Sequence, residues 1–316
     1  MATRVLLTVD TELRWGPYAA GASWQENLRR SFEPAGVGVS WQLDLLARHR
    51  LSACFFVDPM PAEVYGLDPV RAMVAPILAA GQEVQLHLHP CWRSVAEGIG
   101  AGEGFELTGF SASDQQALVG KARQLLIDAG APPPIAFRSG SFAADADTLA
   151  ALTANGIRFD SSHNGSEHPW PSALPLPPEQ IAPVRLGEVI EVPVTQIEDA
   201  PGNLRPMQFC AVSSDEIESA LLHAEAEGHP LVTIVSHSFE FASRDGARPN
   251  RTLCRRFERL CALLAAERER FPTARFNELG DLPLETEGRP LAPQRLRTAR
   301  RMAEQLWSNA VYERAL

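Results

Sequence analysis

Long apolar runs are absent from this sequence: no stretch approaches the ~20 residues that a transmembrane helix needs. An excess of positive charge is absent too, because 29 Lys and Arg residues stand against 39 Asp and Glu residues and the net charge is −10. A nucleic-acid binder would need a basic surface, so the charge argues against that class of function. The apolar run at 5–9 is too short for a signal-peptide core. We therefore expect a cytoplasmic protein without a membrane span.

Two common functional motifs are missing as well. The five cysteines are scattered and contain no Cys-x-x-Cys pair, which is typical of reduced thiols in a reducing compartment. No Gly-x-Gly-x-x-Gly motif follows the first strand-like run, which weighs against a dinucleotide-binding fold.

The sequence does contain a regular alternation of strand-like and helix-like segments over its 316 residues. Helix-like segments with periodic apolar residues, such as 41–50, 70–80 and 251–270, separate short β-branched runs. This order is typical of parallel β/α units and predicts an α/β barrel of seven or eight strands in a single domain at 1–285. The expected strands are residues 5–9, 53–57, 83–89, 134–138, 157–160, 189–194 and 231–235, with 274–277 as a candidate for the last.

Two segments stand outside this alternation. Residues 163–186 form a long Pro-rich loop, and loops of that length in compact domains are usually lids, binding loops or disordered. Residues 286–316 form an Arg-rich helical extension. This helix either docks on the barrel through its large apolar side chains or forms an interface with a partner, a second copy included. The side chains expected to dock are Leu296, Met302, Leu306 and Trp307.

Polar residues of metal-binding type occur in and directly after two of the strands. His87 and His89 are two residues apart in an apolar run, so a strand would place both imidazoles on one face. Two such imidazoles can chelate a metal such as zinc. Asp10 and Glu12 have the same spacing after the first strand. Because parallel strands in a barrel end on one face, these residues predict a metal site, and therefore an enzyme.

The ordered set of motifs resembles the NodB-type polysaccharide deacetylase superfamily, carbohydrate esterase family 4. The resemblance spans roughly residues 4–280, and the nearest likeness is to cytoplasmic members from bacterial surface-polysaccharide gene clusters. It implies a distorted (β/α)7 barrel, a divalent metal for which zinc is the expected ion, and hydrolysis of an N-acetyl amide. The motifs are Thr8-Val-Asp-Thr-Glu12, Phe55-Phe-Val57, Gly81–His89, Phe137-Arg-Ser-Gly-Ser141, Asp160-Ser-Ser162, Glu191-Val-Pro-Val194 and Ser236-His237.

The resemblance assigns roles in the metal site. Asp10 matches the catalytic base of the family, Glu12 would be the carboxylate ligand, and His87 matches the first histidine ligand. The family commonly places its second histidine four residues later, where this sequence has Cys91. Either His89 replaces that ligand, which we favour, or the Cys91 thiolate binds instead.

Five further residues receive roles around the metal. Arg138 matches the arginine that pairs with the catalytic carboxylate, and His237 matches the general acid. Neutral imidazole and imidazolium interconvert near neutral pH, which suits proton donation to a leaving nitrogen. The backbone N–H of Ser141 is the candidate oxyanion donor. Asp160 would orient His237, bind a substrate hydroxyl or cap Ser161 or Ser162. Trp92 would stack on a sugar ring or pack in the interior.

These assignments predict a hydrolase that removes the N-acetyl group from a small or carrier-linked acetamido sugar. Two alternatives remain open. A non-catalytic relative that binds sugars would hold no metal, and the displaced second histidine keeps that alternative open. An amidohydrolase-like or PHP-like metallohydrolase would carry its His-x-His pair on the first strand, whereas here an acidic pair stands there.

Overall fold

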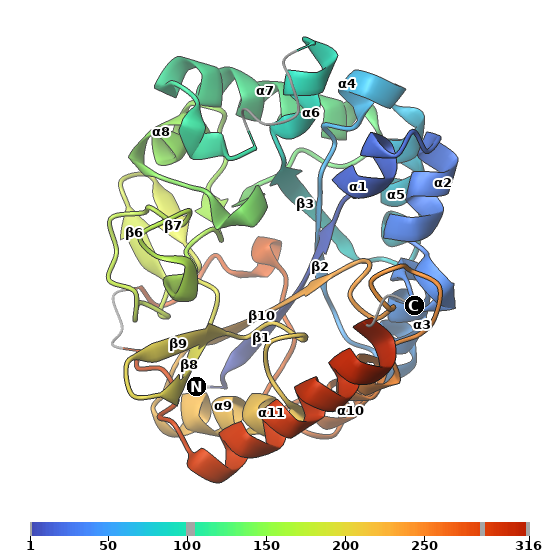
Figure 1. Ribbon diagram of the computed structural model, residues 1–316. Helices are drawn as coiled ribbons and strands as arrows, with labels where there is room; N and C mark the ends of the chain where they lie inside the picture. Colours follow the sequence, from blue (N-terminus) through green and yellow to red (C-terminus); the bar gives the residue numbers. More distant parts are fainter. Residues whose placement is uncertain (1, 99–104, 285–287, 314–316) are drawn as a thin grey trace.

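The computed structural model describes residues 2–98, 105–284 and 288–313. Its centre is a curled eight-stranded sheet with the strand order β10-β1-β2-β3-β4-β5-β7-β6 (Figure 1). The first seven strands in that order are parallel, and β6 joins the far edge antiparallel to β7. The strands are β1 Arg4–Thr11, β2 Cys54–Val57, β3 Glu83–Leu88, β4 Ala136–Ser139, β5 Phe159–Asp160, β6 Val184–Leu186, β7 Val189–Glu191 and β10 Leu231–His237.

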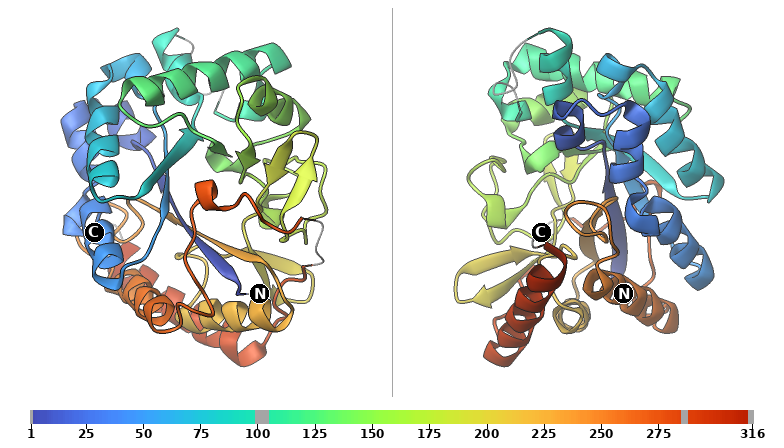
Figure 2. Two further views of the ribbon diagram at one scale, coloured as in Figure 1. Left: turned by 180° about the vertical axis from the view of Figure 1, so that it is seen from behind. Right: turned by 45° about the vertical axis from the view of Figure 1, so that its right-hand side comes forward.

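Helices cover the outer side of the curled sheet, as β/α units require, and both views in Figure 2 show them around its rim. The longer helices are α3 Val39–His49, α5 Asp68–Ala79, α7 Ala112–Asp128, α8 Ala146–Ala154, α9 Ser214–Ala226, α10 Arg251–Ala266 and α11 Arg295–Ser308. Shorter helices are α1 Trp15–Ala19, α2 Trp24–Ser31, α4 Ala62–Tyr65 and α6 Cys91–Ala96, and a separate hairpin consists of β8 Gln196–Ala200 and β9 Asn203–Pro206. Within the described residues, no helix combines the length and apolarity needed to cross a bilayer.

Side-chain caps fix where several of these helices begin. The Ser213 hydroxyl accepts from the backbone N–H of Glu216, whose carboxylate in turn accepts from the N–H of Ser213, so both groups are satisfied at the start of α9. Ser111 caps α7 in the same way, because its hydroxyl accepts from the backbone N–H of Asp114.

Two apolar layers hold the barrel together. The larger lies between the sheet and the outer helices. The smaller lies inside the curl, where Phe276 contacts the rings of Phe56 and Phe159 at centroid distances of 5.5 and 5.7 Å. The predicted strand at 274–277 is therefore wrong: this segment makes a 3-10 turn that fills the barrel. The Glu83 carboxylate fixes the turn by accepting from the N–H of Phe276 and Asn277.

The predicted seven-stranded α/β barrel is confirmed, but the sheet remains open between β6 and β10. The strand expected at 189–194 ends at Glu191, and Pro193 beyond it has no N–H to donate to a ladder. The Pro-rich segment 163–186 is not wholly irregular, because its last residues form the edge strand β6.

The C-terminal helix docks through the opposite face from the one expected. Leu296, Met302, Leu306 and Trp307 are 75%, 54%, 70% and 66% exposed, so the expectation that they dock α11 on the barrel is wrong. The buried residues of the helix are Arg301 and Ser308, and Arg301 donates to the carboxylates of Glu216 and Asp199 at 3.1 and 2.7 Å. Where α11 packs, the barrel presents the carboxylates of Glu216 and Asp199 rather than an apolar groove. The polar face of the helix therefore turns inward.

Candidate metal centre and active site

The strand register collects the predicted polar residues at one edge of the sheet. Asp10 on β1 lies beside His237 on β10, and His87 on β3 lies beside Arg138 on β4. All four residues come at the carboxyl ends of parallel strands, where the loops of a β/α barrel form its functional face.

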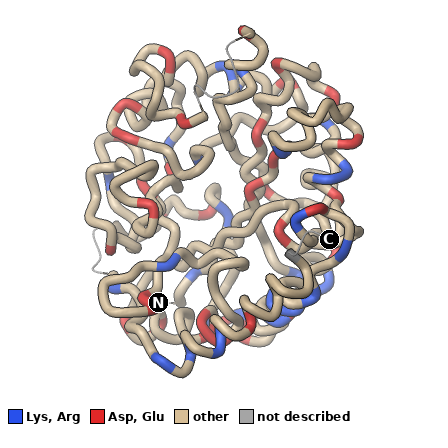
Figure 3. Tube along the Cα trace, in the orientation of Figure 1, with Lys and Arg blue, Asp and Glu red and all other residues tan. Residues whose placement is uncertain are grey.

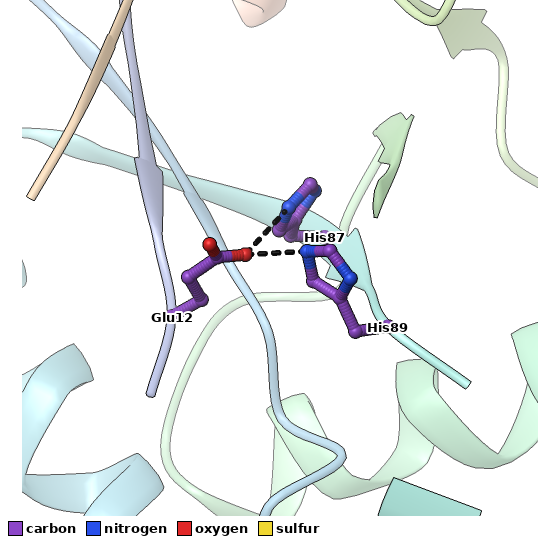
Figure 4. Close-up of side chains that lie close together, drawn as sticks. All are labelled: Glu12, His87 and His89. Carbon is purple, nitrogen blue, oxygen red and sulfur yellow. Dashed lines mark ion pairs between the residues drawn. The ribbon is translucent and has the colours of Figure 1, made fainter. Parts of the chain in front are cut away.

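Glu12, His87 and His89 converge in space, as Figure 4 shows. Their ligand atoms all lie within 4.8 Å of one another. Glu12 Oε2 is 3.3 Å from His87 Nε2 and 2.5 Å from His89 Nε2. The alternation of side chains along a strand explains this, because His87 and His89 both point to the side on which Glu12 lies.

The hydrogen bonds around this cluster leave lone pairs facing its centre. His87 Nδ1 lies 2.7 Å from the backbone oxygen of Arg138, a contact in which the ring N–H must donate. That tautomer leaves the lone pair of Nε2 directed at Glu12. Glu12 Oε2 is buried yet receives no well-directed hydrogen bond from any described residue. One carboxylate and two imidazoles with converging lone pairs fit a divalent cation, and zinc in particular takes this donor set.

The charges within the cluster also favour a bound cation. Burial disfavours the charged form of His89, but the Glu12 carboxylate outweighs it and raises the pKa of His89 to about 9. Burial also acts to raise the pKa of Glu12, yet the two imidazoles lower it well below its usual range. Without a metal, therefore, a proton takes the place that a cation would occupy, since metals and protons compete for such ligands.

Gly140 supplies the space that the His89 ring occupies. A Cβ atom at this position would overlap the ring of His89. The glycine in the Arg138–Ser141 motif is therefore required by close approach of the backbone to a ligand residue. Ser141, the next residue, has a left-handed backbone with φ 53°, which is uncommon for a residue with a side chain.

Asp10 lies between a buried arginine and the candidate general acid. Its Oδ1 accepts from Arg138 Nη1 at 2.7 Å, and its Oδ2 lies 4.0 Å from His237 Nε2. The side chains of Arg138 and Asp10 are 0% and 3% exposed, so this pair is shielded from solvent. Arg138 also donates to Thr8 and Ser161, which fixes the guanidinium in place.

His237 is held from its other side by Glu240. The Glu240 carboxylate accepts from the backbone N–H of His237 at 2.9 Å and lies 3.7 Å from its Nδ1. Burial lowers the pKa of His237, but Glu240 and Asp10 outweigh it and raise the pKa to about 9. At neutral pH His237 is then an imidazolium that has a proton to give.

A cavity of about 170 Å³ adjoins the cluster. It extends from the carboxylate and imidazole ligands into an aromatic and apolar wall. Its lining residues are Glu12, Leu13, Arg14, Trp15, His89, Cys91, Trp92, Phe105 and Ser141. The cavity gives a small acyl group access to the cluster and places Ser141 on its wall.

Two of the predicted substrate contacts are wrong. Asp160 is completely buried; it accepts from Ser162 and lies next to Glu191. A fully buried carboxyl cannot bind a substrate hydroxyl, and the contact with Ser162 confirms the alternative structural role. Trp92 is 1% exposed, because Trp15 and other aromatic rings pack against it, so it supports the cavity wall rather than stacking on a sugar.

Cys91 does not join the ligand cluster in the part of the chain that the structure describes. Burial, together with the nearby carboxylates of Asp58 and Glu12, raises the pKa of the Cys91 thiol, which disfavours the thiolate that a metal would need. Geometry and charge therefore favour His89 as the second imidazole ligand.

Sequence reasoning missed two buried carboxylates near the site. Asp58 follows β2 directly, as Asp10 stands near the end of β1, so the rule of polar strand ends could have found it. Burial raises its pKa to about 6. Glu240 lies three residues after His237, a spacing with no signal of its own until the turn is seen.

Comparisons with known proteins identify the fold. No protein-family model matches the chain. No curated protein matches it either. Among solved structures it is similar to a Mycobacterium smegmatis protein assigned to the polysaccharide deacetylases, with 18% identity, a TM-score of 0.59, and coverage of 92% of this chain and 94% of that one.

Two other solved structures illustrate the range of similar chains. A family 4 carbohydrate esterase from Streptomyces lividans, in complex with acetate, has 16% identity and a TM-score of 0.45, covering 92% and 98% of the two chains. A 4-alpha-glucanotransferase from Thermococcus litoralis has 9% identity and a TM-score of 0.51, covering 93% of this chain and 42% of that one. Identities this low identify the architecture, and the activity must be argued from the site. The fold of this chain is that of the polysaccharide deacetylases.

Proposed function

We propose that this protein is a metal-dependent hydrolase that removes the N-acetyl group from an acetamido sugar. The observation that carries the proposal is the convergence of Glu12, His87 and His89 beside the buried Asp10 and His237, whose facing atoms are 4.0 Å apart. A structural role alone would not need three metal-binding side chains with converging lone pairs next to an acid and a base.

A divalent cation held by Glu12, His87 and His89 would polarise the amide carbonyl and acidify a water molecule. Asp10 accepts the proton of that water, and Arg138 holds the carboxylate in the orientation that this requires. His237 donates a proton to the amide nitrogen as the C–N bond breaks, which converts a poor leaving group into an amine. The Ser141 N–H is our candidate donor to the developing oxyanion.

The proposed substrate is a small or carrier-linked acetamido sugar. The cavity beside the ligand cluster is large enough for an acetyl group and part of a sugar ring. All five cysteines are free thiols, which supports a reducing compartment, and we propose the cytoplasm as the setting. A nucleotide-linked or lipid-linked precursor would be the form of substrate available there.

Acetate release tests this function. The protein loaded with zinc, and in parallel with cobalt, should release acetate from N-acetylhexosamine conjugates, whereas the chelator-treated protein should not until metal is restored. A metal-loaded protein that binds these sugars without releasing acetate would instead identify a non-catalytic sugar-binding relative.

A further inference from the structure

The C-terminal helix α11 has its polar and apolar faces inverted relative to an ordinary surface helix. Its exposed residues include every large apolar side chain that it carries, namely Leu296, Met302, Leu306 and Trp307, with Ala299 and Ala303 among them. Its half-buried and buried residues are all polar: Arg297, Thr298, Arg301, Glu304, Gln305 and Ser308. An ordinary helix would bury the apolar face against the core.

This orientation is fixed by specific contacts. Besides the two carboxylates that hold Arg301, Glu304 accepts from the buried Arg256 at 2.6 Å. Gln305 donates to the backbone oxygen of Cys210, and Ser308 bonds with Asn250. Rotating α11 to bury its leucines would break all of these contacts and leave charges buried without partners. The outward apolar stripe is therefore a fixed property of the fold.

Arginines flank this stripe on a protein that is otherwise acidic. Helices α10 and α11 together carry eight arginines and two glutamates, whereas the whole chain has a net charge of −10. Arg256 and Arg301 are buried in ion pairs, and Arg259 and Arg300 each pair with Asp215, so the excess charge at the surface comes from the other four arginines. Arg295 and Arg300 are exposed on α11, and Arg251 and Arg255 are exposed on α10. Figure 3 shows arginine gathering along the edge of the molecule where these two helices lie.

The charge decides which partner fits. A second copy related by a two-fold axis would bring the same arginines close to one another. The carboxylates nearest to them, Asp215 and Glu218 of α9, already pair with Arg300 and Arg259. A stripe one helix wide is also narrow for a stable dimer, which typically buries about 1,200–2,000 Å² in total. An anionic lipid surface satisfies both features, because it receives apolar side chains between headgroups and attracts the arginines beside them.

We propose that the outward face of α11 is a membrane-docking surface that binds anionic lipid bilayers. The apolar stripe enters the boundary between headgroups and acyl chains, with the helix parallel to the membrane plane. The flanking arginines contact lipid phosphates, while the polar face keeps its contacts with the barrel.

Co-sedimentation of the full chain with vesicles tests the proposal. The protein should bind vesicles of equal parts phosphatidylcholine and phosphatidylglycerol, bind more weakly as salt rises, and not bind phosphatidylcholine alone. The double substitution Leu306→Ser/Trp307→Ser should weaken partitioning at least about tenfold, because each removes large apolar area from the inserting face. Arg295→Gln/Arg300→Gln should weaken binding and reduce its salt dependence.

Trp170→Ser is the matched control, because Trp170 is equally exposed, at 61%, but lies far along the chain from α11. This control should bind vesicles as the unaltered protein does. Circular dichroism and urea unfolding would verify that each variant stays folded. The proposal is overturned if anionic vesicles do not bind the protein, or if the double variant binds them equally well. A dimer in sedimentation equilibrium that Leu306→Ser/Trp307→Ser dissociates would equally overturn it, and would assign the face to a second copy.

Discussion

Asp10 is the residue on which the proposed chemistry depends most, because it lies between Arg138 and His237 without belonging to the ligand cluster. We expect Asp10→Asn to lower kcat by roughly 10²–10⁴-fold, since the amide cannot accept a proton, while zinc content stays at one equivalent. Acetate release and elemental analysis on the same preparation would measure both. A loss of zinc along with activity would instead make Asp10 part of the metal site.

Glu240 sets the proton affinity of His237 from the side opposite Asp10. Its negative charge favours the imidazolium, so Glu240→Gln should lower the pKa of His237. His237 would then lose its proton at a lower pH. The alkaline limb of the plot of kcat against pH should move toward neutrality, with zinc content unchanged. An unshifted limb would show that Glu240 only holds backbone N–H groups.

At the scale of elements, the ion pairs of Arg301 attach α11 to the rest of the protein. Removing this arginine leaves the buried Glu216 carboxylate without its ion-pair partner and Asp199 with Arg205 alone, so Arg301→Ala should lower the free energy of unfolding by about 3–5 kcal/mol. Arg300→Ala, one residue away and exposed, should change it by no more than about 0.5 kcal/mol. Urea unfolding of both variants measures the difference. Equal effects would refute the polar docking of the helix.

The neighbouring strands β5 and β7 each end in a buried carboxyl, Asp160 and Glu191. Burial raises the pKa of Asp160 to about 6 and that of Glu191 well above its usual range. Both groups bind protons more tightly in the folded state than in the unfolded state. Their contribution to stability is therefore complete below about pH 4 and is lost as the pH rises through about 6 and beyond.

Glu191→Gln should weaken that pH dependence, because the amide supplies a permanent donor next to Asp160. The free energy of unfolding of the unaltered protein should fall between about pH 5 and about pH 8 more steeply than that of the variant. Glu179→Gln, at an exposed position, is the control and should keep the original slope. A variant with the same slope as the control would show that the pair does not share a proton.

At the scale of the whole molecule, a metal at the cluster would join the end of β1 to the end of β3. Zinc that binds only the folded state should stabilise it by about 2.7 kcal/mol when free zinc is about 100 times the Kd. We expect zinc to raise the Tm, and a chelator to reverse the increase. His87→Ala/His89→Ala should not respond, whereas His168→Ala should respond as the unaltered protein does. An increase that persists in the double variant would place the zinc elsewhere.

The sequence predicted the parts of the molecule that depend on local periodicity. The alternation of strands and helices gave the parallel barrel, and the two-residue spacing of His87 and His89 placed both on one face. The orientation of α11 could not be predicted in this way, because a helical pattern identifies an apolar stripe but not the buried carboxylates that compete for the opposite face. The role of Asp160 stayed open for the same reason: a polar residue at a strand end can face the site or bond to a neighbouring serine, and the structure shows that it accepts from Ser162.

Gly140 has a consequence for recognising related sites in other sequences. The space for the His89 ring exists only because residue 140, in the turn that follows β4, has no side chain. A chain that keeps the His-x-His spacing but carries any larger residue at the equivalent of Gly140 would have to move its second imidazole. Searches for enzymes with this arrangement should therefore require three separated signatures together, the acidic pair, the histidine pair and the glycine, and treat the histidine pair alone as insufficient.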